Sequence, residues 1–451
     1  MSDSDMHSET AFSIFAAARD CPQGLCVRSP DKDYSFAETA ELAKADLEHL
    51  QRPRPGRPYI LTAKADLATL VRIYALLEAR VPMLLLSPKL TPIEVKACLD
   101  RIEAIEAPLP ENAAAVLFTS GTTGRSKPAI LTRSALFANA KAVNRHIRLT
   151  QDDVWQLSIS PARVGGFGVV TRSLARCSAV ALAPNYSAKA YLESFVRDRI
   201  SIASLVPTML SDMLDTCPDW RTPETLRLVL IGGAACSSRL RQRAQKAHVP
   251  IVTTYAMTET ASTVAMSRYE SRFDPQSSGN VPLDGVELKS AEGELFVRGP
   301  MTMAGYWGAS PLLANEWLDT GDRARTLPDG SFEILGRVTD TIVSGAEKVY
   351  PDEVERALCS IAGIKEALVL GLPDDKWGAI VAALLVAETE PVETVDLIGK
   401  LTQNLARYKC PRRIAWVKEL PQTLAGKYAR SPEILHKLAL ETVHYTTSKV
   451  S

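Results

Sequence analysis

Short apolar segments alternate with helical patterns along the first half of the chain, and this alternation limits its fold more than any other feature. Residues Phe36–Leu50 have a helical pattern, whereas Tyr59–Thr62 and Met83–Leu86 are short apolar runs. Later apolar runs lie at Ala179–Ala183, Ile202–Val206 and Leu226–Ile231. Because helical crossovers join parallel strands, the pattern predicts an α/β fold with parallel or mixed sheets flanked by helices.

The pattern changes after about Gly285, where the expected strands become closely spaced. Gly293–Val297 and Ser331–Ile334 are two such segments, with turn residues around them. Closely spaced strands favour hairpin connections over helical crossovers. We therefore expect a small antiparallel β subdomain here.

The last quarter of the chain has a mixed pattern that is typical of a separate α+β domain. A helix is predicted over Pro351–Cys359, and strands are predicted over Ala367–Gly371 and Val381–Val386. A chain of 451 residues is too long for one hydrophobic core. We expect a large N-terminal domain, residues 1–336, and a small C-terminal domain, residues 337–451.

Composition and charge argue against several classes of partner. Lys plus Arg and Asp plus Glu both number 52, so no net charge would attract nucleic acid or an acidic membrane. The first residues, MSDSDMHSET, are acidic and polar, unlike a secretory signal, and no apolar run reaches membrane-spanning length. The cysteines form no CxxC pair, which favours a reducing cytoplasm over a zinc site or a disulfide framework. They are Cys21, Cys26, Cys98, Cys177, Cys217, Cys236, Cys359 and Cys410.

A loop rich in hydrogen-bond donors follows an apolar run at Leu117–Pro128, with the sequence LFTSGTTGRSKP. Gly121 and Gly124 allow the backbone to approach an anion, and Lys127 adds a positive charge. Hydroxyl groups come from Thr119, Ser120, Thr122, Thr123 and Ser126. Because Pro128 follows the lysine, the loop does not open a helix as a Walker loop does. It is interpreted as a different phosphate loop, and a Ser/Gly-rich surface turn is the alternative.

Further motifs follow this loop in a fixed order. They are Tyr255–Thr260 (YAMTET), Gly293–Leu295 (GEL), Gly305–Trp307 (GYW), Trp317–Asp322 (WLDTGD), Gly336–Arg337 with Asp340, and Gly426–Lys427. Over about Ala114 to Ser431 the chain resembles the adenylate-forming superfamily, which includes acyl- and aryl-CoA synthetases, luciferases and adenylation domains of peptide synthetases. Within it, SLVPT, IGGAA and MTETAST, which begin at Ser204, Ile231 and Met257, resemble the 2-succinylbenzoate–CoA ligases of menaquinone and phylloquinone biosynthesis.

This resemblance implies ATP, Mg²⁺ and CoA as ligands and a small carboxylic acid as substrate. In the family, a carboxylate attacks the α-phosphate of ATP, and a thiol then displaces AMP. The protein supplies position and charge rather than a nucleophile. The C-terminal domain would be a mobile lid that turns about the hinge Gly336–Asp340. The sequence leaves the oligomeric state open, including a homo-oligomer.

The resemblance also implies individual roles for the nucleotide-binding residues. The loop Thr119–Lys127, with Ser120, Gly121, Thr122, Thr123 and Gly124, would hold the β- and γ-phosphates. Thr258 would contact phosphate, and Glu259 would bind Mg²⁺ through a hard carboxylate oxygen, although a lone Glu in a loop is usually solvated. Tyr255 would lie on adenine, and Gly233 and Ala234 would face the adenine edge, for which a tight strand-end turn is the alternative.

Two further positions complete the implied nucleotide site. Asp322 and Arg337 would bind the ribose hydroxyls, since a carboxylate accepts two hydrogen bonds from a diol. Lys427 would bridge the reacting carboxylate and the α-phosphate, and an ordinary surface lysine is the alternative.

Four positions depart from the family pattern. Ala256 replaces a glycine of the TYAMTET segment, Thr339 stands where the hinge commonly has Asp or Lys, and Ala346 replaces a glycine in the loop Ser344–Pro351. In the fourth, SPARVGGFG, Arg163 stands where many relatives have a histidine. An arginine should not be buried without an anion, so Arg163, beside Gly165 and Gly166, either pairs with an internal Asp or Glu or binds a substrate carboxylate.

The sequence therefore predicts an ATP-dependent acid–thiol ligase that forms 2-succinylbenzoyl-CoA. The alternatives are another aryl- or acyl-CoA synthetase, an adenylating enzyme that loads a carrier protein, or a nucleotide-binding protein that has lost catalysis. Retention of Lys127, Glu259, Asp322, Arg337 and Lys427 argues against lost catalysis. Pyrophosphate release would distinguish these alternatives.

Overall fold

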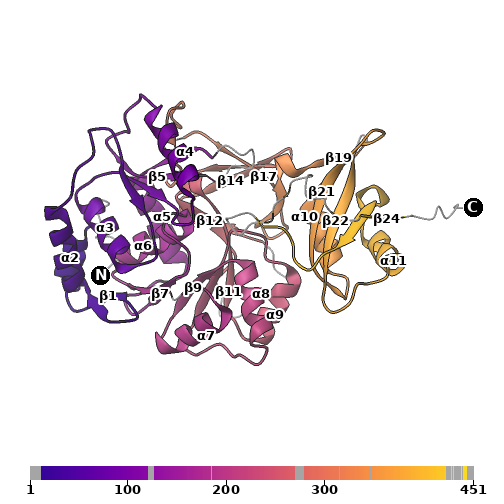
Figure 1. The fold of residues 1–451 in the computed structure, drawn as a ribbon, viewed down its shortest axis with the longest axis horizontal. Coiled ribbons are helices and arrows are strands. Elements are labelled where there is room, and N and C mark those ends of the chain that lie inside the picture. Colours follow the sequence, from indigo (N-terminus) through magenta and orange to yellow (C-terminus); the bar gives the residue numbers. More distant parts are fainter. Residues whose placement is uncertain are drawn as a thin grey trace, which may run out of the picture. The chain divides into compact units, whose positions relative to one another are not determined.

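The chain folds into two compact units in the computed structural model (Figure 1). The structure describes residues 12–119, 126–183, 185–269, 279–313, 315–344 and 347–422, together with 428, 430, 438 and 440–443. Unit 1 comprises Met1–Cys236, Arg243–Leu288 and Val297–Leu318, and unit 2 comprises Ser237–Gln242, Lys289–Phe296 and Asp319–Ser451. The domain boundary expected between residues 336 and 337 stays a prediction.

The longer sheet of unit 1 is mixed, with parallel strands at its centre. Its strand order in the described part of the chain is β13-β12-β11-β10-β9-β7-β8-β1-β2. The strands are β1 (Leu25–Arg28), β2 (Asp33–Ser35), β7 (Val154–Leu157), β8 (Ala179–Leu182), β9 (Ile202–Leu205), β10 (Leu228–Ile231), β11 (Ile251–Met257), β12 (Ser262–Met266) and β13 (Val281–Pro282). The neighbouring strands β11, β10, β9, β7, β8 and β1 pair in parallel. The strands at both edges, β12 and β13 on one side and β2 on the other, pair antiparallel. The predicted α/β fold class is confirmed.

A second sheet of unit 1 carries the end of the predicted phosphate loop. Its order is β16-β6-β5-β4-β3, with β3 (Tyr59–Thr62), β4 (Met83–Leu86), β5 (Ala113–Phe118), β6 (Pro128–Thr132) and β16 (Gly305–Tyr306). Strands β3 and β4 have the predicted bounds. Strand β6 is antiparallel to both β5 and β16. The loop therefore connects the two strands of a hairpin and does not open a helix, and the latter was expected from Pro128.

Several helices of unit 1 begin at recognisable capping residues. The Ser35 and Glu38 side chains form a capping box at the start of α2, and Thr91 and Glu94 form another at α4. The helices are α1 (Ile14–Asp20), α2 (Phe36–Glu48), α3 (Leu67–Glu78), α4 (Pro92–Glu103), α5 (Arg133–His146), α6 (Val164–Arg176), α7 (Ala188–Arg197) and α8 (Pro207–Thr216). A further helix, α9 (Ser238–Lys246), begins in residues assigned to unit 2. Each helix in the described ranges is too short or too polar to cross a lipid bilayer.

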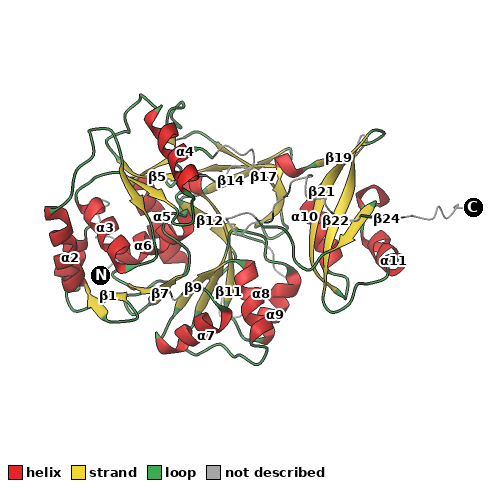
Figure 2. Ribbon diagram, viewed as in Figure 1, coloured by secondary structure: helices red, strands yellow, loops and turns green. Residues whose placement is uncertain are grey.

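Helices α5 and α6 form the layer between the two sheets of unit 1 (Figure 2). They pack against each other; α5 contacts β6 and β12, and α6 contacts β7, β8 and β12. Side chains that face inward from this pair are enclosed by protein on all sides. Phe167 and Val170 are fully buried there, and so are several polar side chains. This layer is therefore where a buried polar contact most needs a partner.

The predicted antiparallel β subdomain is also present. Its strand order is β14-β15-β17-β18, with β14 (Glu287–Ala291), β15 (Glu294–Arg298), β17 (Leu318–Thr326) and β18 (Phe332–Arg337). Strands β17 and β18 pair antiparallel, with Asp322 opposite Arg337. This register places two of the predicted ribose-binding residues on neighbouring strands.

Strand β22 (Gly378–Ala387) of the C-terminal sheet of unit 2 is buried on both faces. The sheet also contains β19 (Ile342–Ser344), β20 (Glu347–Val349), β21 (Ile364–Asp374), β23 (Arg413–Trp416) and β24 (Glu441–Thr442), with α10 (Pro351–Cys359) and α11 (Thr394–Asn404). Along β22, Val381 and Ala383 join the cluster that includes Val354 of α10, whereas Ala382 and Leu384 join another cluster. Burial on both faces explains why this strand is a continuous apolar run.

A single arginine holds three carboxylates together in unit 2. Arg430 Nη1 lies 2.6 Å from Glu355 Oε1, and its Nη2 lies 2.9 Å from Asp352 Oδ1. Its Nε is 3.4 Å from Asp340 Oδ2. Desolvation, reinforced by the nearby Glu355 carboxylate, raises the pKa of Asp352 above its ordinary value of 3.8, although Arg430 and Arg356 oppose the shift.

The raised pKa of Asp352 predicts a pH-dependent stability. Because the folded state retains a proton that the unfolded state releases, stability should fall as pH rises from 3.8 towards neutrality. The side chain in Asp352→Asn cannot titrate. As pH rises over that window, the free energy of unfolding of this variant minus that of the wild type should therefore increase by about 1 kcal/mol or more. Urea unfolding at several pH values would measure this difference. An Asp375→Asn control, at an exposed position, should run parallel to the wild type.

Candidate functional site

Backbone and side-chain hydrogen bonds close the base of the predicted phosphate loop. The Thr119 N–H donates to the Lys127 carbonyl at 2.9 Å, and the Lys127 N–H donates to Thr119 Oγ1 at 3.2 Å. Arg101 of α4 donates to the carbonyl of Ser126. The rest of the predicted loop lies outside the described residues, including Ser120, Gly121, Thr122, Thr123 and Gly124. The structure thus fixes where both ends of the loop leave the sheet.

Lys127, Tyr306 and Glu259 lie together at this end of β6. The Lys127 Nζ is 4.9 Å from the centre of the Tyr306 ring, and the Tyr306 hydroxyl donates to Glu259 Oε1 at 2.7 Å. A tyrosine therefore stands between the predicted phosphate-binding cation and the predicted metal-binding carboxylate. Tyr306 is not among the site residues predicted from the sequence, although its place in the GYW motif could have indicated it.

The segment that carries Thr258 and Glu259 bends sharply after β11. Thr258–Thr260 form a 3₁₀ turn, and the next two residues, Ala261 and Ser262, have φ angles of 51° and 111°. Positive φ is unfavourable for residues other than glycine and persists only where surrounding contacts enforce it. One such contact is the Met303 N–H, which donates to the Glu259 carbonyl at 2.8 Å.

The geometry around Glu259 fits a magnesium ion held largely by phosphate and water. Within the described residues, no group of three or more His, Cys, Asp or Glu side chains is arranged to bind a metal. A site of this kind would use one carboxylate, with the remaining ligands from a nucleotide and solvent, as is usual for Mg²⁺. Glu259 is half-buried, and the Tyr306 hydroxyl orients its carboxylate. The metal role of Glu259 stays a prediction.

The residues predicted to face adenine lie near the ends of two neighbouring parallel strands, Gly233 and Ala234 just after β10 and Tyr255 within β11. Ile231, the last residue of β10, pairs with Thr253 of β11, so Gly233, Ala234 and Tyr255 come after the same paired region. Gly233 has a φ of 82°, which favours glycine, and the turn is exposed. The segment is a tight strand-end turn, and its adenine role stays a prediction.

In unit 2, Asp322 and Arg337 form an ion pair. The Arg337 Nε lies 2.9 Å from Asp322 Oδ1, and its Nη1 donates to the Thr320 carbonyl at 3.0 Å. The Asp322 side chain is 9% exposed and that of Arg337 is 36% exposed. The structure thus brings together the two residues predicted to share the ribose, while their ribose role stays a prediction.

Two predicted functional segments lie wholly or partly outside the described residues. Lys427 is one of them, and the Gly345–Ala346 pair of the expected thiol-channel loop is the other. At the expected hinge, Thr339 lies in a 3₁₀ turn, Val338–Asp340, and its hydroxyl donates to Asp340 Oδ1 at 3.4 Å. Ala256 is exposed on β11.

Arg163 occupies the N-cap of α6 and makes no side-chain capping bond there. Within the described residues its guanidinium pairs with no Asp or Glu, so an internal carboxylate partner is not seen. The side chain is partly exposed, and desolvation of its buried part lowers its pKa. A helix N-terminus attracts anions, and a guanidinium adds a planar set of donors. Because the side chain is exposed, water can also satisfy its donors, and the substrate-carboxylate role of Arg163 stays a prediction.

The two glycines after Arg163 have different surroundings. A Cβ atom on Gly166 would lie 2.2 Å from the Ile159 carbonyl oxygen and 2.4 Å from that of Ser160. A Cβ atom on Gly165 would meet Ile159 Cδ1 only at 3.9 Å. Close packing of α6 on the preceding loop thus accounts for Gly166. The substrate-binding role predicted for both glycines stays a prediction.

This difference predicts opposite outcomes for two alanine substitutions. Gly166→Ala should destabilise the protein by about 2 kcal/mol or more, because rigid backbone atoms must shift to admit the methyl group. Gly165→Ala should leave stability within about 0.5 kcal/mol or raise it slightly, since alanine favours helix. Thermal and urea unfolding would compare them. Equal destabilisation by both substitutions would contradict the packing argument.

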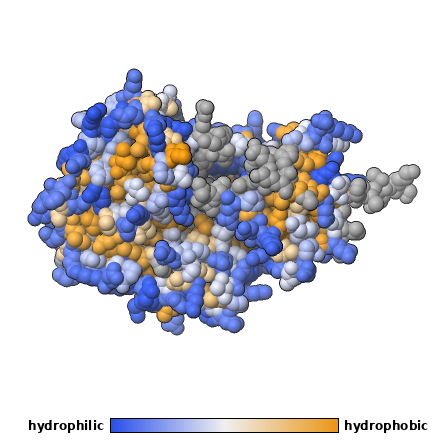
Figure 3. Space-filling view, in the orientation of Figure 1, coloured by the Kyte–Doolittle hydropathy of each residue, from blue (hydrophilic) through white to orange (hydrophobic). Residues whose placement is uncertain are grey.

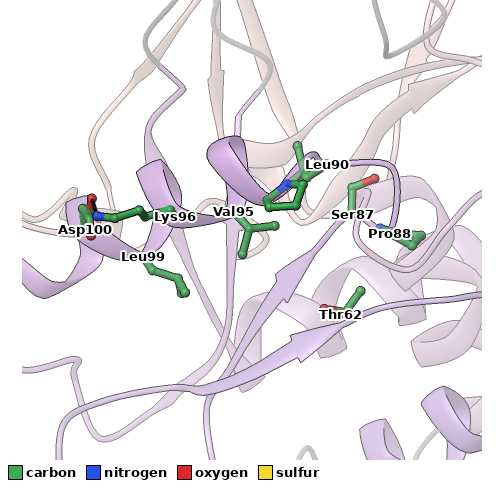
Figure 4. Close-up of a pocket in the computed structure, with 9 residues that line it drawn as sticks. Thr62, Ser87, Pro88, Leu90, Val95, Lys96, Leu99 and Asp100 are labelled. Carbon is green, nitrogen blue, oxygen red and sulfur yellow. Dashed lines mark hydrogen bonds and ion pairs between the residues drawn. The ribbon is translucent and has the colours of Figure 1, made fainter.

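A cavity of about 440 Å³ lies in unit 1 between α4 and the ends of β3 and β4 (Figure 4). Its wall includes Thr62, Ser87 and Leu99. Lys96 and Asp100 of α4 also line it, and Lys96 Nζ lies 2.6 Å from Asp100 Oδ2. On the visible face of this unit, hydrophilic residues are interspersed with apolar patches (Figure 3). Among the predicted site residues that the structure describes, none lines this cavity.

Two family models match the chain. That of the AMP-binding enzymes covers residues 100–307, and that of the AMP-binding enzyme C-terminal domain covers residues 353–427. The 2-succinylbenzoate–CoA ligase of Bacillus cereus (strain Q1) is 31% identical over 334 residues, which are 71% of this chain and 69% of the relative. The ligase of the same name from Bacillus mycoides (strain KBAB4) is also 31% identical over 334 residues, with the same coverage of both chains.

Solved structures agree with these relatives. The o-succinylbenzoate CoA synthetase of Bacillus subtilis, in complex with ATP and magnesium ion, has a TM-score of 0.79 at 25% identity, over 92% of this chain and 98% of that one. ATP-bound MatB from Rhodopseudomonas palustris has a TM-score of 0.83 at 22% identity, over 96% and 99%, and supports the fold alone. The resemblance drawn from the motifs is thus confirmed, and the chain belongs to the AMP-binding enzyme family.

Proposed function

We propose that the protein is an ATP-dependent ligase that joins 2-succinylbenzoate to CoA. Membership of the AMP-binding enzymes, together with similarity to 2-succinylbenzoate–CoA ligases over 71% of the chain, supports this reaction. The observation that carries the proposal is the cluster of Lys127, Tyr306 and Glu259 at the end of the loop. A cation and a carboxylate that both contact one tyrosine suit a bound phosphate chain and its magnesium ion.

The proposed reaction has two displacements. A carboxylate oxygen of the acid attacks the α-phosphorus of ATP, and the bond to pyrophosphate breaks to leave an acyl-adenylate. The CoA sulfur then attacks the acyl carbon, AMP leaves with the bonding electrons, and the thiol proton passes to solvent. Because the nucleophiles come from the substrates, the protein acts by position and charge.

Each unit supplies its own set of residues in this scheme. In unit 1, Thr119 and Lys127 bind the β- and γ-phosphates with the rest of the loop, and Tyr255 lies on adenine. Thr258 contacts phosphate, and Glu259 holds the magnesium ion, which supplies neutralising charge when bound. In unit 2, the Asp322–Arg337 pair binds the ribose, and Lys427 bridges the carboxylate and the α-phosphate. Residues 337–451 turn as a lid about Gly336–Asp340. We place the enzyme in the reducing cytoplasm, which suits eight free thiols.

Arg163 is the residue that we assign to the second carboxylate of 2-succinylbenzoate. It has a guanidinium without a carboxylate partner in the described residues, at the N-terminus of a helix of 13 residues. A dicarboxylate would satisfy this cation through one carboxylate while the other reacts. An acid with one carboxylate would leave the guanidinium unpaired.

Pyrophosphate release from MgATP would test the proposed function. We expect turnover with 2-succinylbenzoate and formation of its CoA thioester, with little turnover of benzoate or medium-chain fatty acids. Omission of CoA should restrict the reaction to about one equivalent of enzyme-bound acyl-adenylate. Preferred turnover of another acid would move the substrate assignment, and activity with none would contradict the ligase proposal.

Substitution of Arg163 would test the substrate assignment. Arg163→Ala should lower kcat/KM for 2-succinylbenzoate about tenfold or more, because a charged hydrogen bond contributes about 1.5–3 kcal/mol. A monocarboxylate analogue should lose less than about twofold. Arg176→Ala, at the other end of α6, is the matched control. Equal losses on both acids would exclude Arg163 from carboxylate recognition.

A further inference from the structure

A buried arginine without a carboxylate partner lies in the layer between the two sheets of unit 1. Arg172 of α6 is 3% exposed, and its Nη2 and Nε donate to Asn139 Oδ1 of α5 at 2.8 and 3.3 Å. Its Nη2 also lies 3.4 Å from Thr263 Oγ1. In the described part of the chain no Asp or Glu pairs with Arg172. Burial of a cation in this way is costly, so the arrangement calls for a reason beyond packing.

The arginine keeps its charge at neutral pH and so fixes the orientation of a neighbouring amide. Burial lowers the pKa of Arg172 to about 9, which still leaves the guanidinium protonated. A guanidinium can only donate, so the oxygen of the Asn139 amide must face it. The amide nitrogen, Nδ2, then points the opposite way. The backbone of α6 leaves room for this contact at Gly168, where a Cβ atom would lie 3.0 Å from Arg172 Cζ.

The Asn139 amide nitrogen donates to the bend that follows Glu259. Its Nδ2 lies 2.8 Å from the Thr263 carbonyl and 3.4 Å from the Thr260 carbonyl. Between these two carbonyls are the residues with positive φ, Ala261 and Ser262. One buried amide therefore ties together both sides of an unfavourable bend, and Asn139 is itself only 2% exposed.

We propose that Arg172 and Asn139 are positioning residues that hold Thr258 and Glu259 in the geometry needed for magnesium and phosphate. This inference rests on the proposed function of the Glu259 segment. The order of contacts is Arg172 to Asn139, and Asn139 to the carbonyls on either side of the bend. Loss of the last contact should release Thr258–Thr260 from its 3₁₀ turn while α5 and α6 remain packed. Binding of MgATP, rather than folding, should then be the property most affected.

The chain offers a matched pair of substitutions on one helix. Asn139→Asp keeps an acceptor for Arg172 but removes the donor to the Thr260 and Thr263 carbonyls. Asn144 is also buried on α5, and its Nδ2 donates to the Arg172 carbonyl at 3.0 Å, away from the bend. Asn144→Asp therefore loses a donor to a buried carbonyl in the same way, without touching the Glu259 segment.

The experiment measures how Mg²⁺ concentration controls the stabilisation of the full chain by ATP in thermal unfolding, without substrate acid or turnover. For Asn139→Asp we expect the half-saturating Mg²⁺ concentration to rise about tenfold. For Asn144→Asp the half-saturating Mg²⁺ concentration should stay within about twofold of the wild type, even if the Tm of this variant without ligand falls as much as that of Asn139→Asp. Arg172→Lys, which keeps the charge but not the paired donors, should give an intermediate rise.

The outcomes separate this inference from the proposed function. If MgATP does not stabilise the wild-type protein, the proposed function fails and the inference fails with it. If the wild type responds but both Asn variants shift equally, or neither shifts, the pair has only a structural role and the proposed function stands. If Asn139→Asp does not fold, Arg172→Lys decides, and an unchanged Mg²⁺ midpoint in that variant overturns the inference.

Discussion

The antiparallel pairing of β6 with β5 on one side and β16 on the other determines where the candidate site forms. Pro128 opposes Phe118, and Ala129 opposes Tyr306, so backbone hydrogen bonds set Lys127 beside the tyrosine. Trp307 strengthens this arrangement, because its backbone N–H donates to the Pro128 carbonyl at 2.8 Å and its indole ring lies in the core. The side chains of the cluster thus take their places from a sheet, which is stiffer than a loop.

Two arginines of unit 1, the partly buried Arg227 and the buried Arg172, have contrasting partners. Arg227 pairs with Asp153 through two bonds, at 2.7 and 2.8 Å, and Ser201 donates to the same carboxylate at 2.7 Å. That arrangement neutralises the charge locally. Among the described residues Arg172 contacts only neutral groups, which are Asn139, Thr263 and the ring of Trp155, so no opposite charge pairs with it. A neutral amide partner leaves Asn139 free to donate on its other side, which a carboxylate in that position would not do.

Local patterns in the sequence predicted the sheets well because buried parallel strands appear as short apolar runs. Strands β3 and β4 and helix α10 have the predicted bounds. The contacts that build the site were beyond such patterns. Asn139 meets Thr263 across 124 positions, and no sequence signal marks positive φ at Ala261 or Ser262. Such contacts depend on how α5 packs on β12, which periodicity along one segment does not encode.

The motifs were sufficient to identify the family and the candidate site residues. They did not explain why each position has its particular residue. Gly166 was grouped with Arg163 as a substrate residue, whereas the space around its backbone is a sufficient reason for glycine. Tyr306 was passed over, although its hydroxyl orients Glu259. In both cases the missing information was a distance, to the loop just before α6 for Gly166 and across 47 positions for Tyr306 and Glu259.

Helix α6 connects the two proposed uses of positive charge in unit 1. Arg163 stands at its N-cap, and Arg172 follows nine residues later in its interior. Nine residues turn a helix by about 2.5 turns, so the two positions face opposite sides. One side meets the loop that contains Ile159 and Ser160, and the other meets α5. In the proposed scheme, recognition of the acid and positioning of the magnesium-binding turn are therefore separable properties of one helix. A substitution at the exposed N-cap can alter acid selectivity without disturbing the enclosed contact between Arg172 and Asn139.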